Sequence, residues 1–277
     1  MIQKILCPTD FSAASNNAIE YAARMAQKMS ATLTLLHIQP LYMGEGVSLF
    51  AGAERESLAE ARESSRMMDD ICLNVNKTFK VSCTHEIIPS MLGSVENAIA
   101  EESANFDLTI LGTNGADNLG QLYFGTHSFK VAKKETGPVI IVPENCAYRE
   151  IINLAFASDY KEGAGLSLEQ LKLFTDAFAP NVRVFHISES DTEQSRALFR
   201  SFSNLTEDAL NQEEQITFER IIHKNEADAI ESVMNKAQVD LLALLLEKHG
   251  FFYRFFHENM IKKLTSIASF PILLFHK

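Results

Sequence analysis

The sequence predicts an α/β protein of two tandem domains, each built around a five-stranded parallel sheet. Short apolar runs rich in β-branched residues alternate with helical-period segments along the 277 residues, and this alternation is typical of βαβ units around a buried sheet. The order of segments repeats in the second half, and the length suits two domains of about 140 residues each. Together these observations indicate a doubled α/β fold.

Five apolar runs in the first half are predicted strands. Helix faces with i, i+4 spacing are predicted along Ala18–Met29 and Leu58–Cys72. The Gly- and Ser-containing stretch Met43–Ala53 interrupts this rhythm and is predicted to be a mobile loop that orders on ligand binding. The predicted strands are Ile2–Pro8, Thr32–Ile38, Val81–Ile88, Leu108–Gly112 and Val139–Val142.

The second half repeats this pattern, with Ile151–Ser158 and Val182–Ile187 as its first two strands and a helix carrying Leu171, Phe174 and Phe178 between them. Four residues of the first half have identical counterparts in the second half, two of them at one sequence offset and two at another. The pairs are Asp10 with Asp159, His37 with His186, Asp107 with Asp240, and Pro138 with Pro271. The repeat predicts domains at 1–145 and 149–277, joined in the 143–149 stretch.

Charge and composition restrict the partners and the compartment. The net charge of −11 repels phosphate backbones and anionic lipids, so neither nucleic acid nor membrane is an expected partner. The four cysteines lack zinc-site spacing and suit a reduced compartment. No apolar run has the length of a signal-peptide core or a membrane span. We therefore expect a cytoplasmic protein without a metal site.

The strongest local signal is a glycine-rich segment after the fourth predicted strand. Gly112-Thr113-Asn114-Gly115 is followed by nine residues and then by Gly125-Thr126, where a helix is predicted to begin. Glycines let a backbone approach a ligand, and a helix start offers free N–H groups and a positive dipole end. The spacing fits neither a Rossmann fingerprint nor a Walker A loop. It predicts a phosphate site at the carboxyl ends of the strands, although such glycines can also be only turn formers.

This segment resembles the universal stress protein family, whose nucleotide-binding members carry G-x2-G-x9-G-[S/T] after the fourth strand. Ile5–Ser12 and Leu35–Ile38 are similar to the family's first strand and turn and to the end of its second strand. The likeness covers the first half and, more faintly, the second. It implies an adenine nucleotide alpha-hydrolase-like, Rossmann-like fold with an internal pseudo-dimer, in which Val139–Val142 lies antiparallel to Ile272–Phe275 because family members pair through their last strands.

The resemblance also implies an adenine-nucleotide site in the first half, for ATP with or without Mg²⁺. The first two strands would hold the nucleoside, and the glycine-rich loop would hold the phosphates. The implied residues are Pro8, Asp10 and Ile38 around the nucleoside, Leu111, Gly112, Gly115, Gly125, Thr126 and His127 around the triphosphate, and Thr9 and Ser128 as further binding residues.

Some of these residues also have a structural interpretation. Asp10 could cap the first helix together with Ser12, with or without contacting a ligand. His37 and His186 lie in apolar strand ends without a carboxylate or cysteine at metal-ligand spacing, which indicates structural histidines. His127 is a departure, because the family usually has a small or apolar residue there.

The second half lacks the phosphate-binding residues. Its register places Leu245, Lys248, Glu258 and Asn259 where the first half has Gly112, Gly115, Gly125 and Thr126. We therefore expect one nucleotide per chain, since Glu258 would repel phosphate oxygens. The aromatic run Phe251–Phe256 is predicted either to pack in the core or a domain contact, or to form a surface for an apolar ligand or a partner.

No motif places a nucleophile, a base and an orienting residue together, so no catalytic residue is predicted. The leading hypothesis is an ATP-binding sensor that acts through protein contacts; the word "stress" rests on fold analogy alone. The alternative is an interaction protein that binds no nucleotide and uses the pseudo-dimer surface and the aromatic run. A third hypothesis is a slow ATP hydrolase. Association of whole chains into a homodimer is left open.

Overall fold

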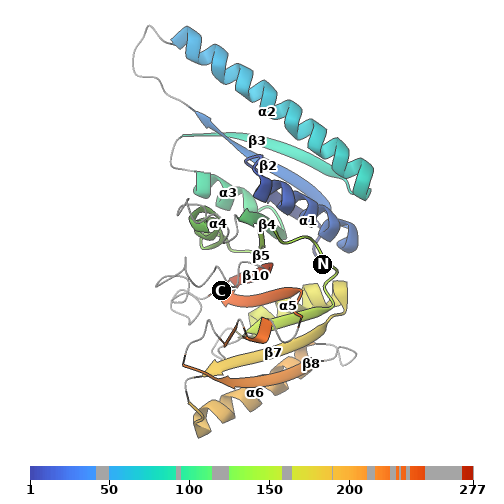
Figure 1. Ribbon diagram of the computed structural model, residues 1–277, viewed down its shortest axis with the longest axis vertical. Helices are drawn as coiled ribbons and strands as arrows, with labels where there is room; N and C mark the ends of the chain where they lie inside the picture. The colour runs from blue at the N-terminus through green and yellow to red at the C-terminus, as the bar shows by residue number, and fades with distance from the viewer. Residues whose placement is uncertain are drawn as a thin grey trace.

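The computed structural model describes residues 1–41, 50–91, 95–113, 125–157, 164–188, 190–210, 216–224, 229–230, 232–234, 238–246 and 270–276. They form a ten-stranded sheet with helices packed on it, which confirms the predicted α/β class. In Figure 1 the sheet runs along the long axis of the molecule, from β3 near the top to β8 near the bottom.

The elements of the two halves follow the same order. Those of the first half are β1 (Lys4–Pro8), α1 (Ala13–Met29), β2 (Thr32–Leu41), α2 (Phe50–Phe79), β3 (Cys83–Met91), α3 (Val95–Ser103), β4 (Leu108–Thr113), α4 (Gly125–Ala132) and β5 (Val139–Pro143). Those of the second half are β6 (Asn153–Ala157), α5 (Ala164–Phe178), β7 (Asn181–Ser188), α6 (Glu193–Ala209), β8 (Ile216–Ile222), β9 (Leu241–Leu246) and β10 (Ile272–His276).

The loop predicted over Met43–Ala53 is wrong at its carboxyl end, because residues 50–53 are the first turn of α2. Ala51 and Ala53 are strong helix formers, and the single Gly52 between them costs only about 1 kcal/mol in a helix. Residues 42–49 lie outside the described part of the chain, so the predicted ordering of this stretch on ligand binding stays a prediction. Strand β2 also continues three residues beyond its predicted end, to Leu41.

The strand order shows how the halves are related. It reads β3-β2-β1-β4-β5-β10-β9-β6-β7-β8, so the second half continues the sheet in the reverse order of the first. The register repeats as well: Ile5 pairs with Leu108 in the first half, as Leu154 pairs with Leu241 in the second. These pairs reproduce both sequence offsets, one for the first two strands of each half and another for the later strands.

In the described sheet the two halves are joined by one antiparallel pair of strands. Ile272, Leu273 and Leu274 of β10 lie opposite Ile141, Ile140 and Val139 of β5. This confirms the predicted pairing of the last strands. Each strand covers an edge that would otherwise expose unpaired backbone groups. The exact boundaries of the two predicted domains stay a prediction.

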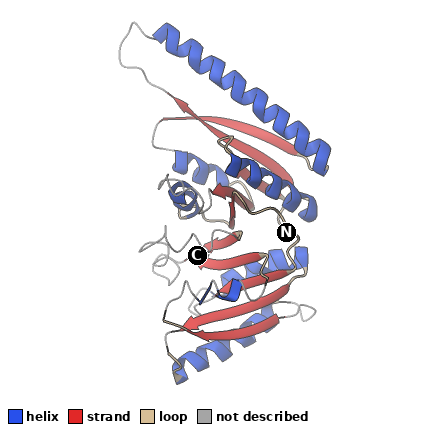
Figure 2. Cartoon of the chain, viewed as in Figure 1, coloured by secondary structure: helices blue, strands red, loops and turns tan. Residues whose placement is uncertain are grey.

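Alternating residues of the buried strands divide the core between the two faces of the sheet. Cys7 and Leu35 point to the face covered by α1, α2, α5 and α6, whereas Leu6 and Leu36 point to the face covered by α3 and α4. Figure 2 shows these helices along the sheet. On α1 the predicted face is confirmed, and its three alanines bring the helix close to the strands. Its buried residues are Ala18, Ala22, Ala26 and Met29.

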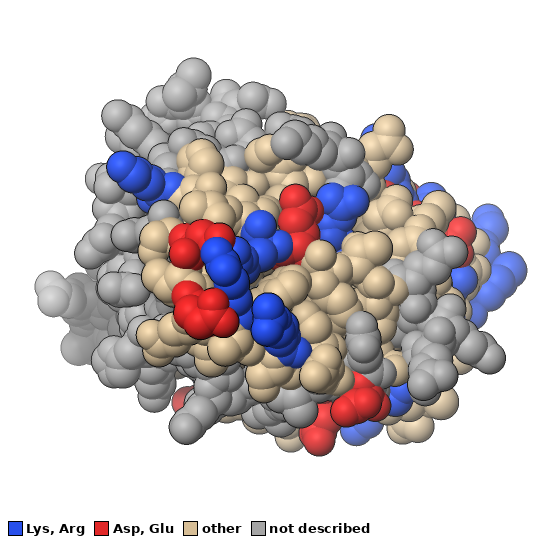
Figure 3. Space-filling model, turned by 90° about the horizontal axis from the view of Figure 1, so that it is seen from below, with Lys and Arg blue, Asp and Glu red and all other residues tan. Residues whose placement is uncertain are grey.

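Two further observations concern the charges on one surface and the apolarity of the helices. On the face seen in Figure 3, at the second-half end of the molecule, basic side chains lie beside acidic ones. Across the described ranges, no helix combines the length and apolarity needed to cross a lipid bilayer.

Candidate functional site

A cavity of about 260 Å³ opens at the carboxyl ends of β1, β2 and β4. This is the edge at which open parallel sheets bind ligands, and the volume is close to the lower end of the roughly 300–1,000 Å³ of small-molecule clefts. Helices α3 and α4 close one side and the start of α1 closes another. The lining is mostly apolar and comprises Pro8, Thr9, Asp10, Ser12, Ala14, Ser15, Leu36, His37, Ile38, Val95, Glu96, Ile99, Leu111, Gly112, Thr113, Ser128 and Val131.

The turn from β1 to α1 is tightly constrained where it meets the cavity. Phe11 has a φ of 63°, a left-handed conformation that costs energy for a bulky side chain. The Thr9 hydroxyl accepts a hydrogen bond from the Phe11 amide at 3.1 Å. The His37 ring lies 4.6 Å from the Phe11 ring between centroids, and its Nδ1 lies 2.9 Å from the Thr9 carbonyl oxygen. His37 therefore supports the turn that carries Asp10, in agreement with its predicted structural role.

Asp10 is the carboxylate that this turn presents to the cavity. Its Oδ1 accepts a hydrogen bond from the Ser12 amide at 3.0 Å, and Ser12 is the N-cap of α1, with its hydroxyl accepting from the Ser15 amide. Partial burial opposes ionisation, but hydrogen bonds from Ser12 and Ser15 outweigh it and hold the pKa of Asp10 below its usual value. Asp10 thus supports the helix cap and remains an exposed acceptor, so the two predicted roles are compatible.

Gly112, one residue before the end of β4, lies in close contact with the start of α1. A Cβ at this position would lie 2.4 Å from the Ala14 carbonyl oxygen and 2.9 Å from the Ser15 amide nitrogen. On the other side, the Ser128 hydroxyl donates a hydrogen bond to the Gly112 carbonyl at 2.8 Å. The glycine therefore joins α1, β4 and α4 at the base of the cavity. The sequence had indicated close backbone approach here, but the nearest backbone belongs to the protein itself.

The structure brings together seven of the eleven predicted site residues around this cavity: Pro8, Thr9, Asp10, Ile38, Leu111, Gly112 and Ser128. Gly115 lies outside the described residues. Gly125, Thr126 and His127 form the first turn of α4, where only their backbone is described. That turn carries no acidic residue, and its amide groups make the cavity's neighbourhood favourable for an anion. The binding roles of all eleven residues stay predictions.

Sequence reasoning missed the contribution of α3 to the cavity. Val95 and Ile99 add to the apolar wall, and Glu96 adds a second carboxylate. Glu96 is largely buried and pairs with Lys130 of α4 at 3.6 Å. The glycine motif gives no signal for α3, because these residues reach the site only through the packing of α3 against α4.

The second half has a different arrangement near the corresponding strand ends. Leu245 occupies the place of Gly112, because Leu245 pairs with Phe275 as Gly112 pairs with Val142. The Leu245 side chain is buried. Lys248, Glu258, Asn259 and the Phe251–Phe256 run lie outside the described residues. The structure therefore shows that a leucine side chain fills the position of the first glycine.

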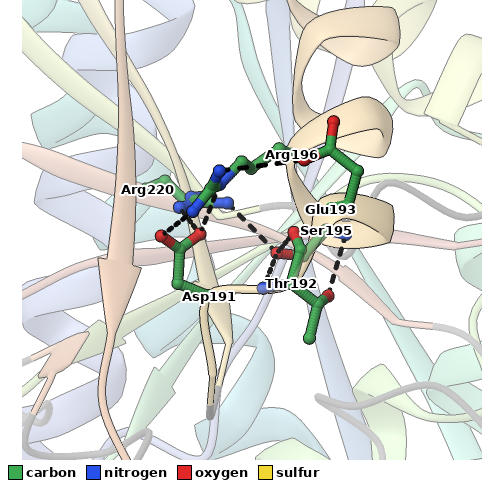
Figure 4. A network of polar contacts seen from close by, with 6 residues as sticks. All are labelled: Asp191, Thr192, Glu193, Ser195, Arg196 and Arg220. Carbon is green, nitrogen blue, oxygen red and sulfur yellow. Dashed lines mark hydrogen bonds and ion pairs between the residues drawn. The ribbon is translucent and has the colours of Figure 1, made fainter.

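A polar cluster joins β8 to the start of α6 in the second half (Figure 4). Asp191 accepts hydrogen bonds from Arg196 at 2.6 and 2.9 Å and also from Arg220. These hydrogen bonds lower the pKa of Asp191 to about 2. Thr192 and Ser195 form a capping box at the helix start. The cluster's charges are thus engaged with one another, which indicates a structural rather than a ligand-binding role.

A match to a family model shows to which proteins this chain is related. A model of the universal stress protein family matches residues 1–143. This chain belongs to the universal stress protein family. The family match covers the half that contains the cavity, the β1–α1 turn and the glycine-rich segment.

Curated universal stress proteins are similar to about half of this chain. One from Mycolicibacterium smegmatis is 27% identical over 143 residues, which are 50% of this chain and 47% of that protein. One from Methanocaldococcus jannaschii is 26% identical over 163 residues, covering 51% of this chain and 95% of that protein. The matched part of this chain thus spans about half the length of the first relative and nearly the whole of the second.

The whole chain is similar in fold to a universal stress protein from Archaeoglobus fulgidus. The structures align with a TM-score of 0.76 over 99% of this chain and 98% of the other, at 14% sequence identity. The likeness in fold therefore extends over both halves, whereas the family model matches the first half.

Proposed function

We propose that this universal stress protein binds one adenine nucleotide, ATP with or without Mg²⁺, in the cavity of its first half, and that the nucleotide regulates contacts with other proteins. One observation supports the proposal: an apolar cavity, the ionised Asp10 and the start of α4 lie together at one edge of the sheet. An apolar wall suits a base, a carboxylate accepts from ribose hydroxyls, and a helix start suits phosphate.

The residues divide these tasks by position. Pro8, Ile38 and Leu111 supply apolar contact at the ends of three strands. Asp10 has an exposed carboxylate at the mouth. Gly125 and Thr126, at the start of α4, would direct amide groups and a hydroxyl to the phosphates, with Gly115 and His127 beside them. Magnesium would be held mainly by the phosphates, as is usual for this ion.

The chemistry of the lining favours nucleotide binding without hydrolysis. A general base works best with a pKa near neutrality, whereas hydrogen bonding lowers the pKa of Asp10. Glu96 is engaged by Lys130, and His37 lies against a backbone carbonyl. The described lining residues thus favour holding a nucleotide over activating a water molecule.

Titration calorimetry of the full chain with ATP, with and without Mg²⁺, tests the proposal. We expect one equivalent to bind, and Gly125→Glu to abolish binding because a carboxylate would meet the phosphates at the helix start. Gly137→Glu is the matched control, since a Cβ there has no neighbour within 4 Å and Gly137 does not line the cavity. Chromatography of nucleotide released from freshly denatured protein provides a second readout.

Three results would contradict the proposal. Two equivalents of ATP per chain, or unchanged binding by Gly125→Glu, would place the nucleotide elsewhere. Absence of both calorimetric binding and co-purified nucleotide would favour the alternative interaction protein that needs no nucleotide.

A further inference from the structure

Two cysteines lie in contact between α2 and the edge strand β3, away from the nucleotide cavity. The Cys83 thiol donates to the Cys72 sulfur, and the two Sγ atoms are 3.3 Å apart. A disulfide requires about 2.05 Å between sulfurs. Small adjustments of the two side chains would therefore bring the sulfur atoms within bonding distance. Neither Cys72 nor Cys83 lines the nucleotide cavity.

The backbone around the pair is already held in place. The Asn76 side chain, one turn after Cys72 on α2, accepts from the Cys83 amide at 3.0 Å and donates to the Cys83 carbonyl at 3.4 Å. These two hydrogen bonds join the helix to the first residue of β3. Since the helix and strand are fixed relative to one another, the two sulfurs face each other without any movement of the chain.

The surroundings make the two thiols unequal. The hydrogen bond from Cys83 lowers the pKa of Cys72, and His85 adds a further hydrogen bond and its charge, against the opposing effects of burial and of Asp69. The same hydrogen bond and burial raise the pKa of Cys83. His85 in turn lies 3.8 Å from the Asp69 carboxylate. Of the two thiols, Cys72 therefore loses its proton more readily, and the thiolate is the nucleophile.

Small molecules have limited access to the pair. Cys72 is 7% exposed and Cys83 is 8% exposed, and the neighbouring His85 side chain is 21% exposed. In Figure 1, α2 and β3 lie at the outer end of the molecule, with β3 as the last strand of the sheet. Both cysteines thus keep a small exposed surface at this outer end, through which a small oxidant can approach the pair.

We propose that Cys72 and Cys83 form a redox-active dithiol that hydrogen peroxide oxidises to a disulfide linking α2 to β3. The Cys72 thiolate attacks one peroxide oxygen, the O–O bond breaks, and hydroxide leaves and takes up a proton to become water. The resulting sulfenic acid on Cys72 is attacked by the Cys83 sulfur; the S–O bond breaks, the S–S bond forms, and the Cys83 proton leaves in a second water. The two sulfurs lose two electrons and the peroxide gains them.

The other two cysteines serve as internal references. Cys7 is fully buried in the same core and burial raises the pKa of its thiol. Cys146 is partly exposed, but burial raises the pKa of its thiol too, against a smaller opposing effect of Arg149. Their reactivity should therefore be lower than that of Cys72, although Cys146 is the more accessible.

The test uses the full chain, treated with equimolar hydrogen peroxide at pH 7 and mapped by mass spectrometry. We expect a mass loss of two hydrogens and a cross-linked peptide pair containing Cys72 and Cys83, reversed by dithiothreitol. Cys72→Ser should abolish the reaction. Cys83→Ser keeps a donor next to Cys72, so the sulfenic acid should form there and be trapped by dimedone. Cys146→Ser is the control and should be oxidised like the wild type.

The pH profile separates a chemical role of His85 from a structural one. In Cys83→Ser, dimedone trapping should reach half of its maximal rate below about pH 8.5, the pKa of an ordinary thiol. His85→Asn should raise this midpoint and slow the reaction several-fold at pH 7. Three results would overturn the proposal: a trapping midpoint at or above about pH 8.5 in Cys83→Ser with His85 intact, oxidation of Cys146 before the pair, or pairing of Cys72 with any cysteine other than Cys83.

Discussion

At Gly112 the absence of a side chain is required by the backbone of α1. The Cβ of an alanine would lie 2.4 Å from the Ala14 carbonyl oxygen, and a backbone atom cannot move aside as the end of a long side chain can. We expect Gly112→Ala to lower the free energy of unfolding by about 1–3 kcal/mol, the usual cost of overpacking. Urea denaturation measures it.

Gly137→Ala is the matched control for that change. Its Cβ would enter open space, so we expect the free energy of unfolding to change by less than about 0.5 kcal/mol or to rise slightly. Equal stability of Gly112→Ala and Gly137→Ala would show that the start of α1 can move away from β4.

Glu135 is a second residue whose surroundings predict a measurable effect. It is 5% exposed and its Oε1 has no hydrogen-bond partner. Burial raises its pKa from 4.5 to about 8, and hydrogen bonds from Thr109 and Ser103 offset this only in part. Because the folded state keeps the proton that the unfolded state loses, Glu135 makes stability fall as pH rises from about 4.5 to about 8.

Replacing Glu135 by Gln removes the titration. We expect Glu135→Gln to gain stability over the wild type as pH rises, with little difference at pH 4.5 and on the order of a few kcal/mol at pH 8. Urea denaturation at both pH values measures the gain. Glu101→Gln changes an exposed side chain and should follow the wild type. A constant difference between Glu135→Gln and the wild type across this range would contradict the expectation.

At the scale of the element, the start of α6 shows how a single cap holds a helix at the outer end of the sheet. The Thr192 hydroxyl accepts from the Ser195 amide at 3.1 Å, and the Ser195 hydroxyl accepts from the Thr192 amide at 3.3 Å. We expect Thr192→Ala to lower the free energy of unfolding by about 1 kcal/mol, the typical value of an N-cap. Chemical denaturation measures it.

Ser190→Ala provides the control for the cap, because Ser190 is exposed and precedes the helix start. It should leave the free energy of unfolding within about 0.5 kcal/mol of the wild type. If both alanine variants were equally stable, the ion pairs of Asp191 with Arg196 and Arg220 would be sufficient to hold the helix start.

The element scale also shows why the sequence analysis missed α3 and misplaced the start of α2. The error at α2 concerns a helix end, where local propensity is weak and neighbouring elements decide the boundary. The residues of α3 were missed because they reach the cavity only through the packing of α3 against α4. Strand identity was easier to predict, since buried strands such as β5 are apolar at every position. The site residues predicted from strand ends accordingly surround the cavity, whereas those supplied by α3 were not foreseen.

At the scale of the whole molecule, β5 and β10 make one continuous sheet out of two halves. Both strands are buried along their whole length. The His276 ring on β10 reaches the carbonyl oxygens of Gly137 at 2.8 Å and Ala132 at 2.5 Å in the first half. Because the contact is made of core residues and backbone ladders, we expect the two halves to unfold together.

Leu273→Ala tests this coupling. Leu273 is fully buried opposite Ile140, so we expect a loss of about 2–5 kcal/mol, the usual cost of this change in a core. Hydrogen exchange should accelerate in both halves. Leu73→Ala, at a leucine that is 66% exposed, should change neither measurement. Faster exchange confined to the second half would show that the halves unfold independently.

The sequence by itself determined the α/β class, the doubled strand order, the antiparallel pairing of the last strands and most of the cavity's strand-end residues. The class and the doubled order depend on local periodicity and on a repeat that is visible along the chain, whereas the strand pairing and the site residues follow from the resemblance to the family. Only the tertiary structure decided that Gly112 meets Ala14, that Glu96 enters the cavity, and that Cys72 faces Cys83. Such contacts join residues from different elements, and their geometry follows from how the helices pack on the sheet, which no local pattern records.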